Sequence, residues 1–257
     1  MMYLNKEKIR WFKDFYGNPT AYLPIKIPSV SSIIDLIPDP ELEKFIKDVG
    51  EEKAKEIMEN AQQRGKAMHK FIENFIKELA KSKDPSLALQ YTLSISPKLL
   101  DEEKVSMDKI DKGREMFYNF YYSDYANAYI DLIGTELAIY SPYLFFRGKT
   151  DVFYNERVFG RVVTDFKTSS KLIEKGSTKE LKYKRQLGGY VLGIEHMLKD
   201  QNIKINKASI LVIQTKSTII QEIICQNEDL EEQKREFENL VKDWHINKNN
   251  QSFLFDD

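Results

Sequence analysis

The sequence predicts an α/β protein in which a helical N-terminal part precedes a core of strands flanked by helices. Apolar residues recur at helical spacing through much of residues 41–129, and from Leu132 the pattern changes to the alternation of strands. Further helical segments then follow these strands, the order expected of an α/β core. With 257 residues, the chain can form one large domain. We expect residues 1–130 to form an N-terminal arm and helical part, residues 131–257 to form the core with a C-terminal helix, and both to pack as one compact unit.

The N-terminal part divides at its prolines and glycines. Residues 17–40 contain five prolines and are predicted to form an extended arm. Residues 41–81 are predicted to be helical almost throughout, with a break at Gly50, because the run IMENAQQRGKAMHKFIENFIKELAK places apolar residues at helical spacing. Residues 84–97 are expected to be a loop. A second helix is expected over residues 101–129, which begin with acids and hold many aromatic side chains.

The core is expected to begin with three consecutive strands. The segments GTELAIYSP, LFFRGKTDVFY and RVVTDFKT have the pattern of strands, with a turn near residues 155–157. A helix is expected over residues 178–199, and ASILVIQT and TIIQEIICQ are two further strands. Residues 228–247 are expected to form the final helix. This order predicts a sheet that helices cover.

Composition excludes several classes of protein. The single cysteine, Cys225, allows no internal disulfide and argues against a cysteine-based zinc site. The net charge of −1 gives no overall basic signal for nucleic acid, so polyanion binding would depend on local clusters. No apolar run approaches the roughly 20 residues of a membrane helix, and the first residues lack the pattern of a signal peptide. We therefore expect an intracellular, cytoplasmic protein that has no membrane segment.

The aromatic run FYNFYYSDYANAY, residues 117–129, has two interpretations. Rings at this density would suit the stacking of nucleic-acid bases. Helical spacing also places Phe117, Tyr121 and Tyr125 on one stripe, which favours packing into the core. Core packing is our expectation for this stripe.

The segment RVVTDFKTSSK holds the first candidate site residues. Period-2 alternation places Asp165 and Lys167 on one face of the strand with Val163. Read alone, such a pair is an ordinary surface ion pair worth ~0.5 kcal/mol. A buried charge, in contrast, is costly unless it is paired or binds a metal. The other candidates are a G-x-x-x-H helix motif, two strand acids and a Q-x-x-x-Y helix motif: Gly65 and His69, Glu136 and Asp151, and Gln186 and Tyr190.

This ordered set resembles the motifs of the PD-(D/E)xK nuclease superfamily, and more narrowly those of its RecB-like exonuclease branch. GKTD, VVTDFKTS and QLGGY follow the G-x-x-x-H motif in order, and the upstream IPSVSSII is similar to mitochondrial genome maintenance exonucleases and their phage and bacterial relatives. The resemblance implies a restriction-endonuclease-like core with a central mixed sheet. It also implies a metal-dependent DNA exonuclease that prefers single-stranded DNA, in repair, recombination or replication. A bacterial or phage-encoded protein is the expectation, and a mitochondrial one stays open.

The resemblance also implies roles for individual residues. One or two Mg²⁺ or Mn²⁺ ions would be bound by two carboxylates, an imidazole and a backbone carbonyl: Asp151, Asp165, His69 and Phe166. The catalytic group would consist of Asp151, Asp165, Lys167 and Glu136. Lys167 would orient or deprotonate the attacking water, or stabilise charge at phosphorus. Glu136 would hold a second metal, a metal-bound water or Lys167, or is simply an exposed acid on a strand.

DNA contacts are expected around this group. Gln186 and Tyr190 would contact DNA or support the metal ligands, or else pack on the sheet. Nearby cations would line a backbone-binding channel or form solvated faces: Arg147, Lys149, Lys171, Lys182, Lys184 and Arg185. The final QSFLFDD loosely resembles sliding-clamp ligands through Gln251, Leu254 and Phe255. It is a candidate docking peptide for a replication or repair protein, unless its rings pack on the core.

Two other functions stay open at this point. A structure-specific endonuclease of the same superfamily would use the same residues. A non-catalytic DNA-binding accessory protein would keep the fold without turnover, although the joint presence of Asp151, Asp165 and Lys167 favours an enzyme.

Overall fold

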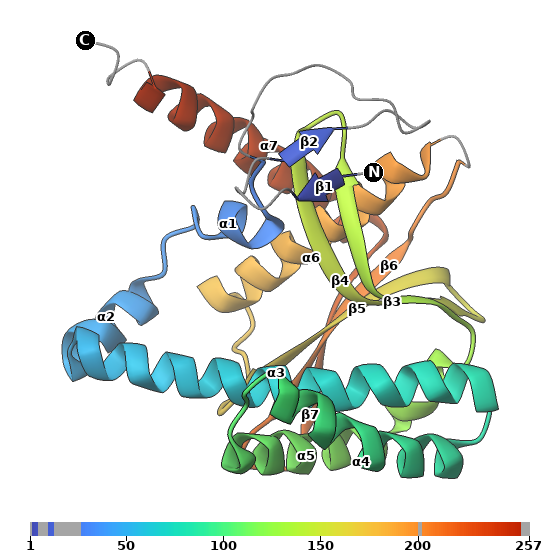
Figure 1. Cartoon of the computed structure of the whole chain (residues 1–257). Coiled ribbons are helices and arrows are strands. Elements are labelled where there is room, and N and C mark those ends of the chain that lie inside the picture. The colour runs from blue at the N-terminus through green and yellow to red at the C-terminus, as the bar shows by residue number, and fades with distance from the viewer. Residues whose placement is uncertain (1, 5–9, 13–26, 200–201, 253–257) are drawn as a thin grey trace.

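A five-stranded mixed sheet forms the centre of the protein. The computed structural model describes residues 2–4, 10–12, 27–199 and 202–252 (Figure 1). The strand order is β3-β4-β5-β6-β7, in which β5 and β6 are parallel and the other neighbouring pairs are antiparallel. The expected α/β fold with a central mixed sheet is therefore confirmed. The strand bounds are Leu132–Ser141 for β3, Phe146–Glu156 for β4, Gly160–Ser169 for β5, Lys207–Gln214 for β6 and Ile220–Gln226 for β7.

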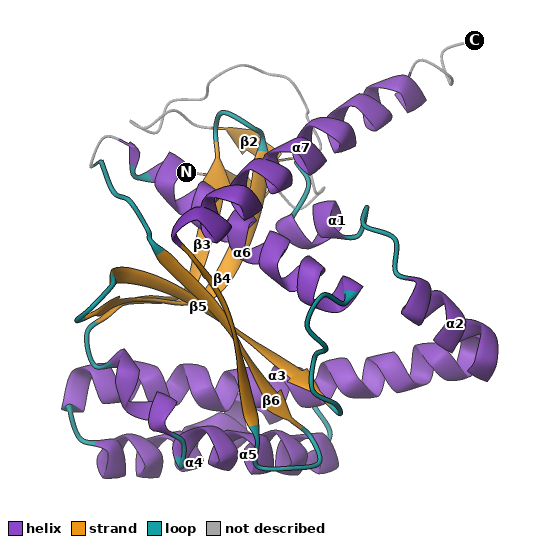
Figure 2. Cartoon of the chain, turned by 180° about the vertical axis from the view of Figure 1, so that it is seen from behind, coloured by secondary structure: helices purple, strands orange, loops and turns teal. Residues whose placement is uncertain are grey.

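Helices cover both faces of this sheet (Figure 2). One face packs against α3 and α5, which share an apolar cluster with α4, and the other face packs against α1, α6 and α7. Two short strands, β1 and β2, pair separately at Met2–Leu4 and Arg10–Phe12. The helix bounds are Val30–Ile34 for α1, Pro40–Val49 for α2, Glu51–Ser82 for α3, Pro85–Glu102 for α4, Met107–Tyr121 for α5, Asp124–Tyr129 for the 3-10 helix η1, Thr178–Met197 for α6 and Asn227–Ser252 for α7.

Strand β5 contributes side chains to both apolar clusters, one on each face of the sheet. Val163 belongs to the cluster with α6 and α7, whereas Val162 and Phe166 belong to the cluster with α3 and α5. The predicted alternation of this strand is confirmed. Asp165 and Lys167 share the side of Val163 and therefore face α6.

The prediction of a loop at residues 84–97 is wrong, because residues 85–97 lie in α4 and Asp84 caps this helix. The Oδ1 atom of Asp84 caps the helix by accepting hydrogen bonds from two backbone N–H groups of the first turn, at 2.8 and 3.2 Å. Pro85 is acceptable at the first helical position, where no N–H is needed. Two polar residues concealed the helical period: Thr92 and Ser96 are fully buried.

Other boundaries differ in part from the expectation. The helix expected over residues 101–129 is interrupted at 103–106, between α4 and α5, and it ends at Tyr121, after which residues 124–129 form the 3-10 helix η1. In the expected arm over residues 17–40, α1 is a short helix, and residues 17–26 lie outside the described part of the chain. The break at Gly50 is confirmed, since this residue has a φ of 85° and separates α2 from α3.

The predicted aromatic stripe, which spans α5 and η1, packs into the core. Phe117 is fully buried and stacks on Phe71 of α3, with ring centroids 5.6 Å apart. Tyr121 and Tyr125 are partly buried against the same cluster. The core interpretation of this stripe is confirmed.

Helix α7 ends the described part of the chain at Ser252. Leu254, Phe255 and the side chain of Gln251 lie outside the described residues, so the docking peptide stays a prediction. Among the described helices, none is both long enough and apolar enough to span a membrane.

Candidate active site

The antiparallel pairing of β4 with β5 stops where the candidate acids begin. The last paired residues are Val152 and Thr164, and Asp151 follows immediately on β4. Beyond this point β5 continues to pair with β6. The backbone N–H of Phe166 donates to Asp151 Oδ2 at 2.7 Å. Because a buried N–H needs an acceptor, the carboxylate takes the place of a strand partner and is held beside β5.

Asp165 and Lys167 form an ion pair on the side of β5 that faces α6. Lys167 Nζ lies 2.5 Å from Asp165 Oδ2, and Asp165 is 2% exposed, so this is not a surface pair. Burial and the nearby Asp151 raise the pKa of Asp165 to about 6, although Lys167 opposes the shift. Burial lowers the pKa of Lys167, but Asp165, Tyr190 and Asp151 together raise it by more. Lys167 is therefore a cation at neutral pH.

His69 reaches the same group from α3. Its Nδ1 lies 3.2 Å from Asp151 Oδ2. Burial lowers the pKa of His69, but Asp151 raises it by more, so the net shift is upward. For Asp151, burial raises the pKa, and His69, Lys167 and the Phe166 N–H lower it by more. His69 and Asp151 thus form a second close contact beside the ion pair of Lys167 and Asp165, and protonation of His69 would make it an ion pair as well.

Close packing of α3 against α5 places His69 in this position. The two helices touch at Gly113, where an added Cβ would lie 2.4 Å from the Cβ of Ala67, so a side chain does not fit. Gly65, one turn before His69, faces Thr168, but an added Cβ would lie 3.7 Å from Thr168 Oγ1, an ordinary contact. The close approach of the two helices therefore depends on Gly113 and not on the glycine of the G-x-x-x-H motif.

One face of α6 completes the group. Gln186 Nε2 donates to the Tyr190 hydroxyl at 2.6 Å, and Tyr190 is 6% exposed. Tyr183 lies on the same face, because it precedes Gln186 by three residues. Burial raises the pKa of Tyr183 to about 12, and the charges of Lys167 and Asp165 also act on it. Tyr183 was not among the predicted site residues, although its helical spacing to Gln186 and Tyr190 was available in the sequence.

Glu136 lies near the group but has a different partner. It falls level with Asp151 in the β3–β4 register. Its backbone φ is 51°, a left-handed conformation that costs about 1 kcal/mol or more for a residue with a side chain. Its carboxylate pairs with Lys149. In the described part of the chain, no hydrogen bond or ion pair joins Glu136 to Asp165 or Lys167.

Most of the cations expected in a DNA channel are engaged within the protein. Lys149 pairs with Glu136. Arg147 is fixed by its backbone N–H, which donates to the Pro28 carbonyl at 3.0 Å, while its buried Nε has no hydrogen-bond partner among the described residues. Lys171 is exposed. The cations of α6 form ion pairs with acids of other elements. Lys182 pairs with Asp39, the residue before α2, at 3.1 Å. Lys184 pairs with Asp229 of α7 at 3.1 Å, and Arg185 pairs with Glu236 of α7 at 3.5 Å.

The donor set fits a divalent metal ion in kind. Two carboxylates and an imidazole lie together, and such donors suit Mg²⁺ and Mn²⁺. Asp165 Oδ2 is buried and accepts no hydrogen bond of regular geometry from the described residues. Within the same residues, no three His, Cys, Asp or Glu side chains are arranged to hold an ion as they stand. The two carboxylates instead contact side chains of the protein, Asp151 at His69 and Asp165 at Lys167.

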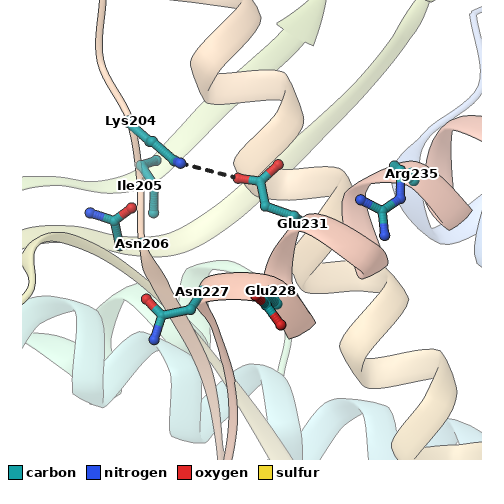
Figure 3. Close-up of a pocket in the computed structure, with 7 residues that line it drawn as sticks. All are labelled: Lys204, Ile205, Asn206, Asn227, Glu228, Glu231 and Arg235. Atoms are coloured by element: carbon teal, nitrogen blue, oxygen red, sulfur yellow. Dashed lines mark ion pairs between the residues drawn. The ribbon is translucent and has the colours of Figure 1, made fainter.

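A cavity elsewhere in the protein contains none of these residues. Its volume is about 510 Å³, and Lys204 and Glu231 form an ion pair of 3.9 Å beside it (Figure 3). It lies where β6 begins, whereas Lys167 is level with Val212 towards the other end of that strand. The polar group on β4 and β5 is therefore the candidate site, and the cavity is separate from it. The cavity is lined by Lys204, Ile205, Asn206, Asn227, Glu228, Glu231 and Arg235.

Comparison with known proteins identifies the family. A sequence profile of the PD-(D/E)XK nuclease superfamily matches residues 45–253, well over half of the chain, and this range includes the whole candidate site. No curated protein matches the sequence. The crystal structure of SSO0001 is 16% identical over 70% of this chain and 74% of its own, with a TM-score of 0.29, which is too low to support an argument. On the strength of the profile match, the chain belongs to the PD-(D/E)XK nuclease superfamily.

Proposed function

We propose that this protein is a metal-dependent deoxyribonuclease of the RecB-like branch, an exonuclease that prefers single-stranded DNA. Membership of a nuclease superfamily indicates hydrolysis of phosphodiester bonds in nucleic acid. The observation that supports the enzyme most strongly is the grouping of Asp151, Asp165 and Lys167 in a largely buried cluster beside His69. The burial of Asp165, its ion pair with Lys167 and the contact of Asp151 with His69 favour an enzyme over a protein that only binds DNA.

In this proposal the metal ligands are those predicted from the motifs. Asp151, Asp165 and His69, with the backbone carbonyl of Phe166, would hold Mg²⁺ or Mn²⁺. When bound, the cation supplies charge neutralisation at phosphorus and makes a bound water more acidic. Two acids that lie close together suit a dication, because each disfavours the ionisation of the other in its absence.

Lys167 would act as an electrostatic group and not as the base. Its raised pKa keeps the side chain protonated, and a protonated lysine can stabilise negative charge on a phosphoryl oxygen or orient a water. Asp165 holds it through the 2.5 Å ion pair. Gln186 would orient Tyr190 through the 2.6 Å hydrogen bond, which makes these two residues supports of the site. Glu136 would become a further metal ligand only after its carboxylate breaks its ion pair with Lys149.

The preference for single strands and for DNA ends rests on the order of the motifs, from the G-x-x-x-H helix to the Q-x-x-x-Y helix. A role in repair, recombination or replication in the cytoplasm belongs to the same proposal.

The test is digestion of DNA labelled at the 5′ or the 3′ end, as single strands and as duplexes, with Mg²⁺, Mn²⁺ or EDTA. The proposal predicts metal-dependent release of short products from linear single strands. A covalently closed single-stranded circle should stay intact. Cleavage of the circle would replace the exonuclease with an endonuclease, and tight DNA binding without turnover would favour an accessory protein.

A further inference from the structure

Two stacked tyrosine rings lie at the end of helix α5: Tyr118 of the helix, which is half-buried, and the exposed Tyr122 directly after it. Tyr118 and Tyr122 lie one turn apart, with ring centroids 6.2 Å apart and ring planes 17° from parallel. Tyr122 is 77% exposed, and Tyr121 packs edge-on against it at 5.0 Å. A tyrosine so exposed adds little to the core. The Tyr122 ring is therefore the part of the aromatic run that core packing does not explain, and Tyr118 supports it from the turn below.

The helix that carries these rings is fixed to the catalytic strand. Phe120 projects from the opposite side of α5 and packs edge-on against Phe166, at 5.5 Å between centroids. Phe166 stands between Asp165 and Lys167 on β5. A helix is about 10–12 Å across, so the two rings lie roughly one helix diameter beyond the strand that bears the candidate catalytic residues.

A continuous edge of the fold connects the two places. The backbone N–H of Thr215 donates to the Ser169 carbonyl at 2.9 Å, which joins the loop after β6 to the end of β5. Asn119 Nδ2 of α5 donates to the Ser217 carbonyl of the same loop at 3.0 Å. Figure 2 shows this loop, between β6 and β7, beside α5. The route from the end of β5 to the tyrosines therefore crosses the end of the sheet at which β5 and β6 finish.

The charge along this edge suits a polyanion. Lys171 and Lys216 are exposed, and no ion pair engages either of them within the described residues. They differ in this respect from Lys182 and Lys184, which bind acids. Of the nearby acids, Glu115 of α5 is paired with a lysine at 2.8 Å, whereas the exposed Asp124, two residues after Tyr122, has no ion pair within the described residues.

We propose that Tyr118 and Tyr122 form a stacking platform for the bases of single-stranded nucleic acid outside the active site, with Lys216 and Lys171 contacting its phosphates. The substrate class rests on the proposed function. Aromatic rings stack on bases without regard to sequence, and lysines beside them follow the backbone. The platform would hold the part of the strand that has not reached, or has already left, the buried carboxylates.

The first experiment measures binding of fluorescein-labelled dT20 by fluorescence anisotropy in EDTA, where no cleavage occurs. Tyr122→Ala should weaken binding about ten-fold, since a stacked base contributes about that factor. Lys216→Ala should weaken binding less and reduce its dependence on salt. The matched control is Tyr143→Ala, which removes a tyrosine that is 53% exposed and has Lys199 at 4.6 Å, but lies in the β3–β4 turn. If Tyr143→Ala binds dT20 with the affinity of the wild type while Tyr122→Ala binds it more weakly, the platform is supported.

A second measurement reports stacking directly. Tyr122→Trp should keep dT20 binding and show quenching of tryptophan fluorescence beyond that of the two native tryptophans, whereas Tyr143→Trp should not. Equal binding by Tyr122→Ala and wild type, equal loss in Tyr143→Ala, or no binding of dT20 at all would overturn the platform. These outcomes are independent of cleavage, so a protein that binds dT20 through Tyr122 but never cleaves DNA would contradict the proposed function alone.

Discussion

Asp165→Asn is expected to stabilise the metal-free protein at neutral pH. The pKa of this carboxyl is about 6 in the folded protein against an ordinary value of 3.8. Since one pKa unit corresponds to about 1.4 kcal/mol, ionised Asp165 lowers the free energy of unfolding by about 3 kcal/mol once the pH exceeds 6. Asparagine has nearly the same shape and never ionises, so it removes this penalty.

Proton linkage gives the pH range of the effect. The folded state holds the proton of Asp165 to higher pH than the unfolded state does. The contribution of this group to stability is therefore greatest below about pH 4, falls between about pH 4 and 6, and is constant above that range. The difference between variant and wild type should be near zero at pH 4 and about 3 kcal/mol at pH 8.

Urea unfolding in EDTA at several pH values measures this difference, and thermal unfolding at pH 8 should show a Tm higher by roughly 6–12 °C for a protein of this size. The control is Asp229→Asn, which removes a partly exposed partner of Lys184 and should change stability by less than about 1 kcal/mol. A variant no more stable than wild type at pH 8, or a difference that does not vary with pH, would refute the reasoning.

The ion pairs and the α3–α5 contact lead to three more expectations. Lys167→Ala should lower metal-dependent cleavage about 100-fold or more while circular dichroism stays that of wild type; wild-type turnover would count against its role. Mn²⁺ should raise the Tm of the wild type clearly at pH 8 and little at pH 5, because a proton on Asp165 competes with the ion; equal shifts would contradict this. Gly113→Ala should lower the free energy of unfolding by about 1–3 kcal/mol through its contact with Ala67, whereas Gly65→Ala should not lower it.

The strands of the sheet were predictable because their successive side chains must alternate between the apolar clusters on the two faces of the sheet. On β5 this requirement alone assigns Val162 and Val163 to opposite sides. It also places Asp165 and Lys167 together. The helix α4 was not predictable by the same means, since Thr92 and Ser96 are polar by type and yet lie fully buried. Thr92 Oγ1 donates to the Ala88 carbonyl at 2.7 Å, which satisfies its hydroxyl inside the core.

The site shows a similar division. The candidate residues were chosen from the motifs, but the end of β4–β5 pairing at Val152 depends on register, which local sequence does not encode. That register decides that Asp151 accepts from the Phe166 N–H. Proximity in sequence was also misleading for the cations. Lys184 and Arg185 stand next to Gln186, but the helical period turns them towards α7.

The central claim is that the buried group on β4 and β5 hydrolyses phosphodiester bonds with the help of a divalent metal. Its most direct test is the cleavage of end-labelled linear single-stranded DNA in Mn²⁺, compared among wild type, Lys167→Ala and the surface control Lys242→Ala, whose ammonium binds Glu238 of the same helix. The account predicts cleavage by wild type and by the surface variant, none in EDTA, and a loss of about 100-fold or more in Lys167→Ala. Equal cleavage by all three proteins, or cleavage that continues in EDTA, would contradict it.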